Sequence, residues 1–305
     1  MNWKSEIKAA ADRIAGHAQV TPVMESRVVG LDYPVEMKLE HMQHTGSFKA
    51  RGAFNTLLSM EVPQAGVVAA SGGNHGAAAA FAARALDHPA KIFVPELAGP
   101  SKIALIEQIG ADLSVVSGEY ANALTMARIH EEETGAMQIH AYDAPATVAG
   151  QGTCFAEWDA QGLQADTVLI AVGGGGLIAG ALAWFQGARK VVAVEPETSC
   201  ALHAALGAGE PVDVSVSGIA ANALGARQIG RICFDLAQGV NSVLVPDEAI
   251  AAAQQTLWQA HRILVEPAGA TALAALMSGA YQPDPGERVA VLVCGGNIAP
   301  DPLAG

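Results

Sequence analysis

Residues 67–85, VVAASGGNHGAAAAFAARA, form the stretch of sequence that decides the fold. The apolar run Val67–Ala70 predicts a short buried strand, and the alanine-rich run Ala77–Ala85 predicts a helix. The loop Ser71–Gly76 between them has free backbone amides at the start of the helix, where the helix dipole favours a carboxylate or a phosphate. A plain turn with Asn74 as the helix N-cap explains the loop equally well. The stretch therefore predicts a strand–loop–helix unit, with the anion site left open.

Strand and helix patterns alternate along the rest of the chain. Further apolar strands are predicted at residues 91–94, 112–116, 167–172, 190–194 and 289–293. Strands that alternate with helices indicate βαβ units and a mostly parallel sheet. The fold class that follows is α/β.

A second glycine-rich loop follows the predicted strand 167–172. It contains Gly173, Gly174, Gly175 and Gly176, and continues through Leu177 into a helical pattern. Four consecutive glycines cost chain entropy, so they indicate backbone that approaches another group closely. A phosphate on the amides of the helix N-terminus is the natural candidate, although the spacing matches neither the P-loop nor the dinucleotide fingerprint. A flexible turn is the alternative.

The segment 45–53, TGSFKARGA, holds Lys49 between an aromatic residue and small residues. Partial desolvation of an ammonium group lowers its pKa and frees an amine that can form a Schiff base with an aldehyde. A solvated surface lysine explains this segment alone equally simply.

The apolar run Val289–Val293 ends in Cys294 and two glycines, Gly295 and Gly296. Open α/β sheets hold their ligands at the carboxyl ends of such strands. The alternative is an inert buried cysteine, because free cysteine is among the most buried residue types.

Taken together and in this order, these segments resemble the fold-type II pyridoxal phosphate enzymes, in the branch of the serine/threonine dehydratases and serine racemases. The resemblance runs from about Thr21 to about Asn297. Further segments that look like family signatures are Gly150–Thr153, Val194–Pro196 and Val265–Ala270.

The resemblance implies two open parallel-sheet domains, each of three layers, as in the β subunit of tryptophan synthase. It places residues 1–62 and 142–305 in a large domain that binds pyridoxal 5'-phosphate. Residues 63–141 form a smaller inserted domain, and the cofactor lies in the cleft between the two. A homodimer is also implied.

Individual roles follow from the resemblance position by position. It implies that Lys49 binds the cofactor covalently and then serves as the base, and that Asn74 bonds the oxygen of the cofactor ring. The glycine loop with Leu177 holds the phosphate, Cys294 faces the pyridine nitrogen, and Glu266 helps to order the site. The substrate carboxylate is received by the asparagine loop, specifically Ser71, Gly72, Asn74 and His75.

The implied activity is removal of water from a β-hydroxy amino acid such as L-threonine or L-serine, which gives a 2-oxo acid and ammonia. A neutral thiol at Cys294 does not favour a protonated pyridine ring, and the weaker electron sink favours prompt elimination over transamination. Relatives that racemise have a second serine where this chain has Gly72. A racemase or β-replacement synthase of the same fold is the alternative, and a non-catalytic ligand-binding protein is a third hypothesis.

Other positions depart from the family or carry no role in it. The cation site of several relatives corresponds to Glu195, Ser199 and Ala201, and the alanine removes one carboxylate, so we expect no metal. His41 and His44 precede Lys49 and are expected to be partly buried structural histidines. Ser217 and its neighbours replace an acidic motif near the site, so substrate preference is open.

The composition agrees with this interpretation. The 305 residues allow two domains, and 51% hydrophobic with only 15% charged residues fits helices packed on buried parallel sheets. A formal net charge of −13 argues against nucleic acid or an anionic membrane as partner. The four cysteines show no disulfide-like or metal-like spacing, and no stretch is long enough for a membrane span. We expect a cytoplasmic protein without a C-terminal regulatory domain, and hence without feedback control by isoleucine.

Overall fold

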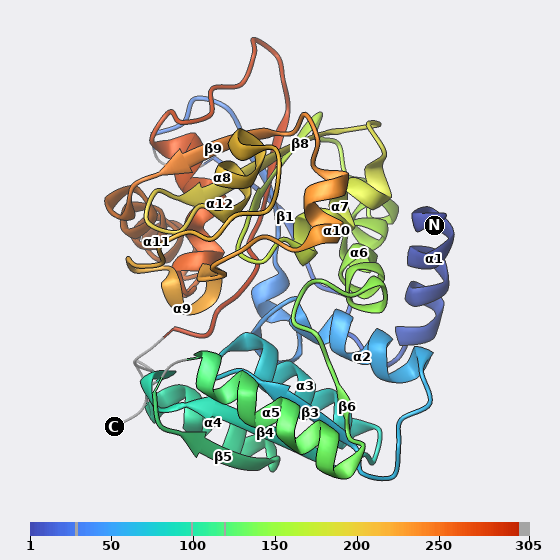
Figure 1. The fold of residues 1–305 in the computed structure, drawn as a ribbon. Coiled ribbons are helices and arrows are strands. Elements are labelled where there is room, and N and C mark those ends of the chain that lie inside the picture. The colour runs from blue at the N-terminus through green and yellow to red at the C-terminus, as the bar shows by residue number, and fades with distance from the viewer. Residues whose placement is uncertain (28–29, 99, 119, 299–305) are drawn as a thin grey trace.

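The computed structural model describes residues 1–27, 30–98, 100–118 and 120–298, which form two sheets with helices packed around them (Figure 1). The larger sheet has six strands in the order β1-β2-β10-β7-β8-β9. Their bounds are β1 Val23–Ser26, β2 Val35–Lys38, β7 Thr167–Ala171, β8 Lys190–Pro196, β9 Asn241–Val245 and β10 Val289–Leu292. Only the edge strand β1 runs antiparallel to its neighbour, and the other pairs are parallel.

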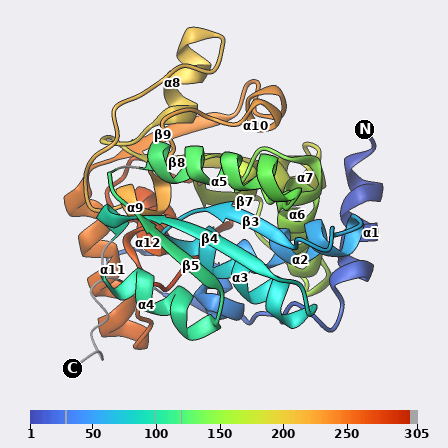
Figure 2. The same cartoon turned by 60° about the horizontal axis from the view of Figure 1, so that its bottom comes forward.

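The smaller sheet has four parallel strands in the order β5-β4-β3-β6. Its strands are β3 Val67–Ala70, β4 Ala90–Pro95, β5 Asp112–Val116 and β6 Met137–Gln138. Helix α5 (Tyr120–Thr134) lies on one side of this sheet, and α3 (Asn74–Ala85) and α4 (Pro100–Ile109) lie on the other (Figure 2). Buried strands covered on both faces explain why β3 and β7 are continuous apolar runs without alternation.

The remaining helices surround the larger sheet and join the two parts. They are α1 Trp3–Ile14, α2 Lys49–Ser59, α6 Pro145–Ala160, α7 Gly176–Phe185, α8 Ala201–Ala208, α9 Ala221–Leu224, α10 Arg231–Leu236, α11 Asp247–His261 and α12 Pro267–Met277. Short 3-10 turns occur at η1 Glu40–Met42, η2 His44–Gly46 and η3 Glu96–Ala98. Helix α12 packs on the central strands, and α6 packs on both α2 and α7.

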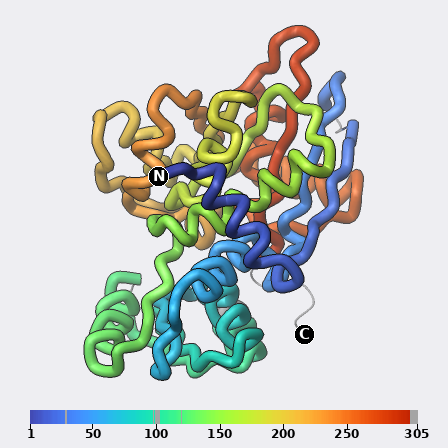
Figure 3. The backbone as a smooth tube through the Cα atoms, turned by 90° about the vertical axis from the view of Figure 1, so that its right-hand side faces the viewer, coloured from blue at the N-terminus to red at the C-terminus, as the bar shows by residue number. Residues whose placement is uncertain are grey.

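The predicted fold class is confirmed, and every strand predicted from the sequence is present. The four-stranded sheet uses residues 67–138, inside the segment predicted to be inserted, and Figure 3 shows this part below the six-stranded part. The proposed domain boundaries themselves stay a prediction. Helix α2, which the prediction assigns to the large domain, packs Ala50, Phe54 and Leu57 into the core of the smaller sheet. The two parts therefore share this helix.

Candidate active site

Lys49 is the first residue of α2, and backbone contacts with the end of β10 fix its position. Ser47 forms a β-bridge with Gly295, and the amide of Phe48 donates a hydrogen bond to the carbonyl of Cys294 at 3.2 Å. The Lys49 ammonium donates to the carbonyl of Ala141 at 2.7 Å. Burial lowers the pKa of Lys49 to about 8, and nearby Cys294 and Glu266 oppose that shift only in part. The amine is therefore far easier to deprotonate than that of a surface lysine.

Asn74 lies opposite Lys49 and is held by two side chains. Its Nδ2 donates to Glu266 Oε1 at 2.5 Å, and its Oδ1 accepts from Asn297 Nδ2 at 2.8 Å. Asn297 also donates to the carbonyl of Thr45 at 2.7 Å. The N-cap of α3 is Gly73 and makes no side-chain cap bond, so the alternative that made Asn74 the cap is wrong. The Asn74 amide is oriented by side chains of the site instead.

The second glycine loop forms the start of α7. Gly175 is the N-cap of this helix and has a φ of 91°, which a side chain would strain. A Cβ at Gly174 would lie 2.2 Å from Cδ1 of Tyr142, so the ring packs directly on the loop. The glycines thus leave the first amides of α7 open to an anion while the neighbouring chain packs closely.

Cys294 lies at the carboxyl end of β10 and is buried. Its Sγ donates to the carbonyl of Ala268 at 3.3 Å. Burial, followed by the charge of Glu266, raises the pKa of this thiol far above its usual value. Cys294 therefore presents a neutral sulfur.

The predicted cofactor residues line one enclosed pocket. The residues that line it include Phe48, Lys49, Asn74, Tyr142, Gly173, Gly174, Gly175, Gly176, Leu177, Glu266, Ala268 and Cys294. The pocket adjoins a cleft of about 530 Å³, whose lining includes the predicted substrate loop Ser71–His75. Lys49, Asn74 and Tyr142 line both cavities, so they stand at the junction.

The substrate loop presents backbone more than side chains to the cleft. His75 Nε2 lies 2.8 Å from the carbonyl of Ile139, and burial lowers the pKa of His75 to about 3, so the ring is neutral. Ser71 Oγ accepts from the amide of Gly73 at 3.1 Å. A Cβ on Gly72 would lie 2.2 Å from Cβ of Ala98, so the fold leaves no room there for a side chain.

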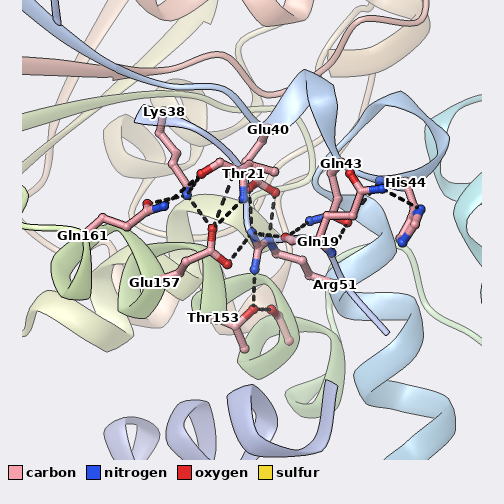
Figure 4. A network of polar contacts seen from close by, with 11 residues as sticks. Gln19, Thr21, Lys38, Glu40, Gln43, His44, Arg51, Thr153, Glu157 and Gln161 are labelled. Carbon is pink, nitrogen blue, oxygen red and sulfur yellow. Dashed lines mark hydrogen bonds and ion pairs between the residues drawn. The ribbon is translucent and has the colours of Figure 1, made fainter. Parts of the chain in front are cut away.

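Beside the pocket, a buried ionic cluster fixes α2 to the larger sheet (Figure 4). Arg51 donates to both oxygens of Glu40 at 2.8 Å and to Glu157 at 2.9 Å. Lys38 completes the cluster with a 2.5 Å ion pair to Glu157. Arg51 and Glu40 are 2% and 0% exposed, so nearly every charge is neutralised by a partner instead of water. Sequence analysis missed this cluster, along with Asn297 and Tyr142.

Three further predicted features lie outside the two cavities. His44 stacks on Phe81 at 4.7 Å, and burial lowers the pKa of His41. Neither histidine is among the described residues that line the pocket or the cleft. Ser217 also lies outside them, although Val216 lines the cleft.

At the position of the relatives' cation site, the Glu195 carboxylate accepts hydrogen bonds from the amides of Leu202 and His203, both at 2.8 Å. Burial raises the pKa of Glu195 to about 7. In the described residues, no three histidines, cysteines or acidic residues gather as metal ligands.

The donor groups of the pocket fit pyridoxal phosphate. An amine with a pKa of about 8 can bond the aldehyde, and the amides at the start of α7 can hold the phosphate. The Ser47 hydroxyl is buried next to Lys49 in sequence and has no hydrogen-bond partner in the described part of the chain. This unmatched polar atom agrees with a pocket that is shaped for a polar ligand.

Comparisons with known proteins agree with this chemistry. A family model described as pyridoxal-phosphate dependent enzyme matches residues 14–295. A phenylserine dehydratase from Ralstonia pickettii is 37% identical over 270 residues, which cover 86% of this chain and 82% of the relative.

Two solved structures are also similar. That of maize serine racemase has a TM-score of 0.91 and 29% identity, covering 97% of this chain and 93% of the other. That of a threonine deaminase from T.th. has a TM-score of 0.89 and 34% identity, covering 96% and 98%. None of the helices in the described ranges combines the length and apolar character that a membrane crossing requires.

Proposed function

The chain belongs to the pyridoxal-phosphate-dependent enzyme family, and from that premise we propose which of its residues carry the reaction. It is a lyase that uses pyridoxal phosphate and removes water from β-hydroxy amino acids to give a 2-oxo acid and ammonia. The observation that supports the assignment of residues is the convergence of Lys49, Asn74, Cys294 and the glycine loop on one pocket.

Lys49 is the covalent anchor of the cofactor and the base. Bound pyridoxal phosphate supplies the electron sink for the pair that is released when the α-carbon of the substrate loses its proton. The amine of Lys49 accepts that proton, and its pKa of about 8 suits a base that works near neutral pH. Ala141 holds the same amine through its carbonyl and so orients it.

Two helix starts receive the anionic groups. The amides at the start of α7, in the loop Gly173–Leu177, hold the cofactor phosphate. The amides of the loop Ser71–His75, at the start of α3, hold the substrate carboxylate. Both loops are short of side chains, so backbone N–H groups can approach the anions closely.

Two side chains tune the cofactor ring. Asn74 bonds the ring oxygen, and its orientation is set by Glu266 and Asn297. Cys294 faces the ring nitrogen as a neutral group, because its pKa is raised by burial. A neutral partner does not stabilise a protonated ring, which favours loss of the β-substituent.

Elimination dominates racemisation because only one face of the α-carbon has a base. Racemisation needs an acid and a base on opposite faces, and the position that would supply the second group is Gly72. Ala98 and Val94 occupy the space of a side chain at Gly72. Gly72→Ser alone is therefore expected to lower stability without adding racemase activity, whereas Gly72→Ser with Ala98→Gly has room for the hydroxyl.

The decisive experiment is a panel of L-threonine, L-serine, 3-phenylserine and 3-hydroxyaspartate. Formation of 2-oxo acid and ammonia is measured together with the enantiomer of the remaining substrate by chiral chromatography. We expect elimination from at least one compound at a rate well above its racemisation. Racemisation as fast as elimination would overturn the role given to Gly72 and favour the racemase.

We also propose that the enzyme is a cytoplasmic homodimer that binds no metal at Glu195. The Glu195 carboxylate is already engaged by two backbone amides, which supports the last point. Light scattering of the purified protein tests the oligomeric state, and equilibrium dialysis against Mg²⁺ and Ca²⁺ tests the cation site.

A further inference from the structure

Removal of water requires a proton donor, because hydroxide is a poor leaving group. Such a donor must hold its proton at neutral pH and stand where the cofactor pocket meets the substrate cleft. Three functional side chains line both cavities, namely Lys49, Asn74 and Tyr142. Lys49 is the base, and the amide of Asn74 is not an acid. Tyr142 alone among the three carries an acidic proton.

The position of Tyr142 links the glycine loop, the base and the cleft wall. Its ring packs on Gly174, and the preceding carbonyl, that of Ala141, holds the Lys49 amine. The phenol hydroxyl donates to the carbonyl of Gln228 at 3.4 Å, near the outer limit of a hydrogen bond. Such a weak contact costs little to exchange for a bond to a substrate oxygen.

Other proton-bearing side chains of the two cavities are engaged elsewhere. His75 is neutral and its Nε2 lies against the carbonyl of Ile139. The Cys294 thiol donates to the carbonyl of Ala268. Glu266 Oε1 accepts from Asn74, which requires a lone pair there and no proton. Tyr120 is a second phenol, but it lines the cleft alone.

Resting on the proposed function, we propose that Tyr142 is a catalytic residue whose phenol protonates the β-hydroxyl of the substrate as the bond from Cβ to oxygen breaks. The oxygen leaves with the electron pair of that bond and with the phenol proton, as water. The phenolate then regains a proton from water in the open cleft. Lys49 takes the α-proton, so the sum of the two transfers is loss of one water molecule.

The acidity of Tyr142 is compatible with this step. Burial, with smaller effects of Tyr120 and Asp143, raises the pKa of Tyr142 to about 12. The phenol thus keeps its proton at neutral pH and is still a stronger acid than water, whose pKa is about 15.7.

The test compares a substrate whose leaving group needs a proton with one whose leaving group does not. Tyr142→Phe is assayed with the best β-hydroxy amino acid of the panel and with β-chloro-L-alanine, from which chloride departs unaided. We expect kcat/KM for the hydroxy substrate to fall about a hundredfold, the lower end of general-acid contributions. For the chloro substrate it is expected to change less than about threefold by the same reasoning. An equal fall with both substrates, or no fall with either, would overturn the proposal.

Tyr120→Phe is the matched control, because it removes the other phenol of the cleft. The ratio of the two rates is expected to stay as in the wild type, and a ratio that shifts as in Tyr142→Phe would refute a special role for Tyr142. Cofactor affinity, measured by absorbance titration of the cofactor-free protein, is expected to be unchanged in Tyr142→Phe because the ring stays on Gly174. If this variant does not fold, Tyr142→Leu is expected to give the same shift in ratio.

Failure of the proposed function would look different. A wild-type protein that eliminates chloride but removes water from no β-hydroxy amino acid would refute the dehydratase itself. Wild-type removal of water with an unchanged ratio in the variants would refute Tyr142 alone.

Discussion

Helix α2 carries two cations, two residues apart, in surroundings that give them opposite properties. Arg51 is buried among carboxylates, and although burial alone lowers its pKa, the charge and hydrogen bonds of Glu40 raise it above its ordinary value. Lys49 faces a pocket in which a backbone carbonyl accepts its hydrogen bond, and burial lowers its pKa to about 8. Burial alone therefore does not decide whether a cation is structural or reactive, because a charged partner reverses its effect.

The same contrast separates two buried carboxylates. Burial raises the pKa of Glu40, but Arg51, Thr21 and Lys38 together bring it below its ordinary value. Glu195 accepts two backbone amides and has no cation in its hydrogen-bond set, and its pKa rises to about 7. The cluster around Arg51 holds fixed charges, whereas the groups without a counter-charge can gain or lose protons near neutral pH.

Removing the reactive cation is expected to have the largest effect. Lys49→Ala should abolish formation of 2-oxo acid, because it removes both the covalent anchor and the base. Lys49→Arg is the matched control: it keeps the charge but cannot be deprotonated, so it should be inactive as well. Turnover near the wild-type rate in either variant would contradict the assignment.

Removing the structural cation should affect stability instead. Arg51→Met leaves Glu40 and part of Glu157 without a counter-charge, and we expect a loss of about 3–5 kcal/mol in the free energy of unfolding, measured with urea. Arg51→Met with Glu40→Gln should lose less, because no unpaired carboxylate remains at Glu40.

The exposed pair of Arg231 and Asp235 offers a control for this prediction. Arg231→Met should cost less than about 0.5 kcal/mol, as surface ion pairs contribute little. Equal losses in the single and double variants at Arg51 would show that charge pairing is not what the cluster provides.

Glu195 should make stability depend on pH. Its folded pKa of about 7 lies above the unfolded value of about 4.5, so the folded state binds more protons between these two pH values. The stability it confers is complete below pH 4.5 and is lost as pH rises through about 7, by at most about 3 kcal/mol.

The measurement is the difference in unfolding free energy between wild type and Glu195→Gln at pH 5 and pH 8. Other titrating groups cancel in that difference. A difference that is the same at both pH values would show that Glu195 ionises normally.

The smallest effect is expected at Cys294. Cys294→Ser keeps a neutral group that can still donate to the carbonyl of Ala268. Activity with the best substrate should stay within about tenfold of the wild type, or about 1.4 kcal/mol in the barrier. A loss of several hundredfold would mean that the thiol acts through more than its neutrality.

Local patterns in the sequence were enough to predict the strands and both glycine-rich loops. Lys49, Asn74 and Cys294 could be predicted because each lies in a motif next to a strand or a helix start. Asn297 and Tyr142 could not, since their contacts join segments far apart in the chain and leave no periodic signal. The Arg51 cluster was missed for the same reason: its partner Glu157 is on a different helix, α6.

Sterics explain the remaining differences. That Gly72 faces Ala98 depends on how η3 approaches the substrate loop, which no residue pattern encodes. Helix α2 was assigned to one domain by position in the sequence, but its apolar face fits the core of the other sheet.

The order of strands in the larger sheet has a consequence for synthesis on the ribosome. β10 pairs with β2 on one side and β7 on the other, although it is made after both. Until β10 emerges, β2 and β7 have no common neighbour, and Ser47 and Phe48 lack the Gly295 and Cys294 backbone that positions them. The four-stranded sheet has all its strands much earlier and can form while translation continues. A nascent chain that is stalled before residue 289 should therefore fold in part and yet be unable to capture the cofactor.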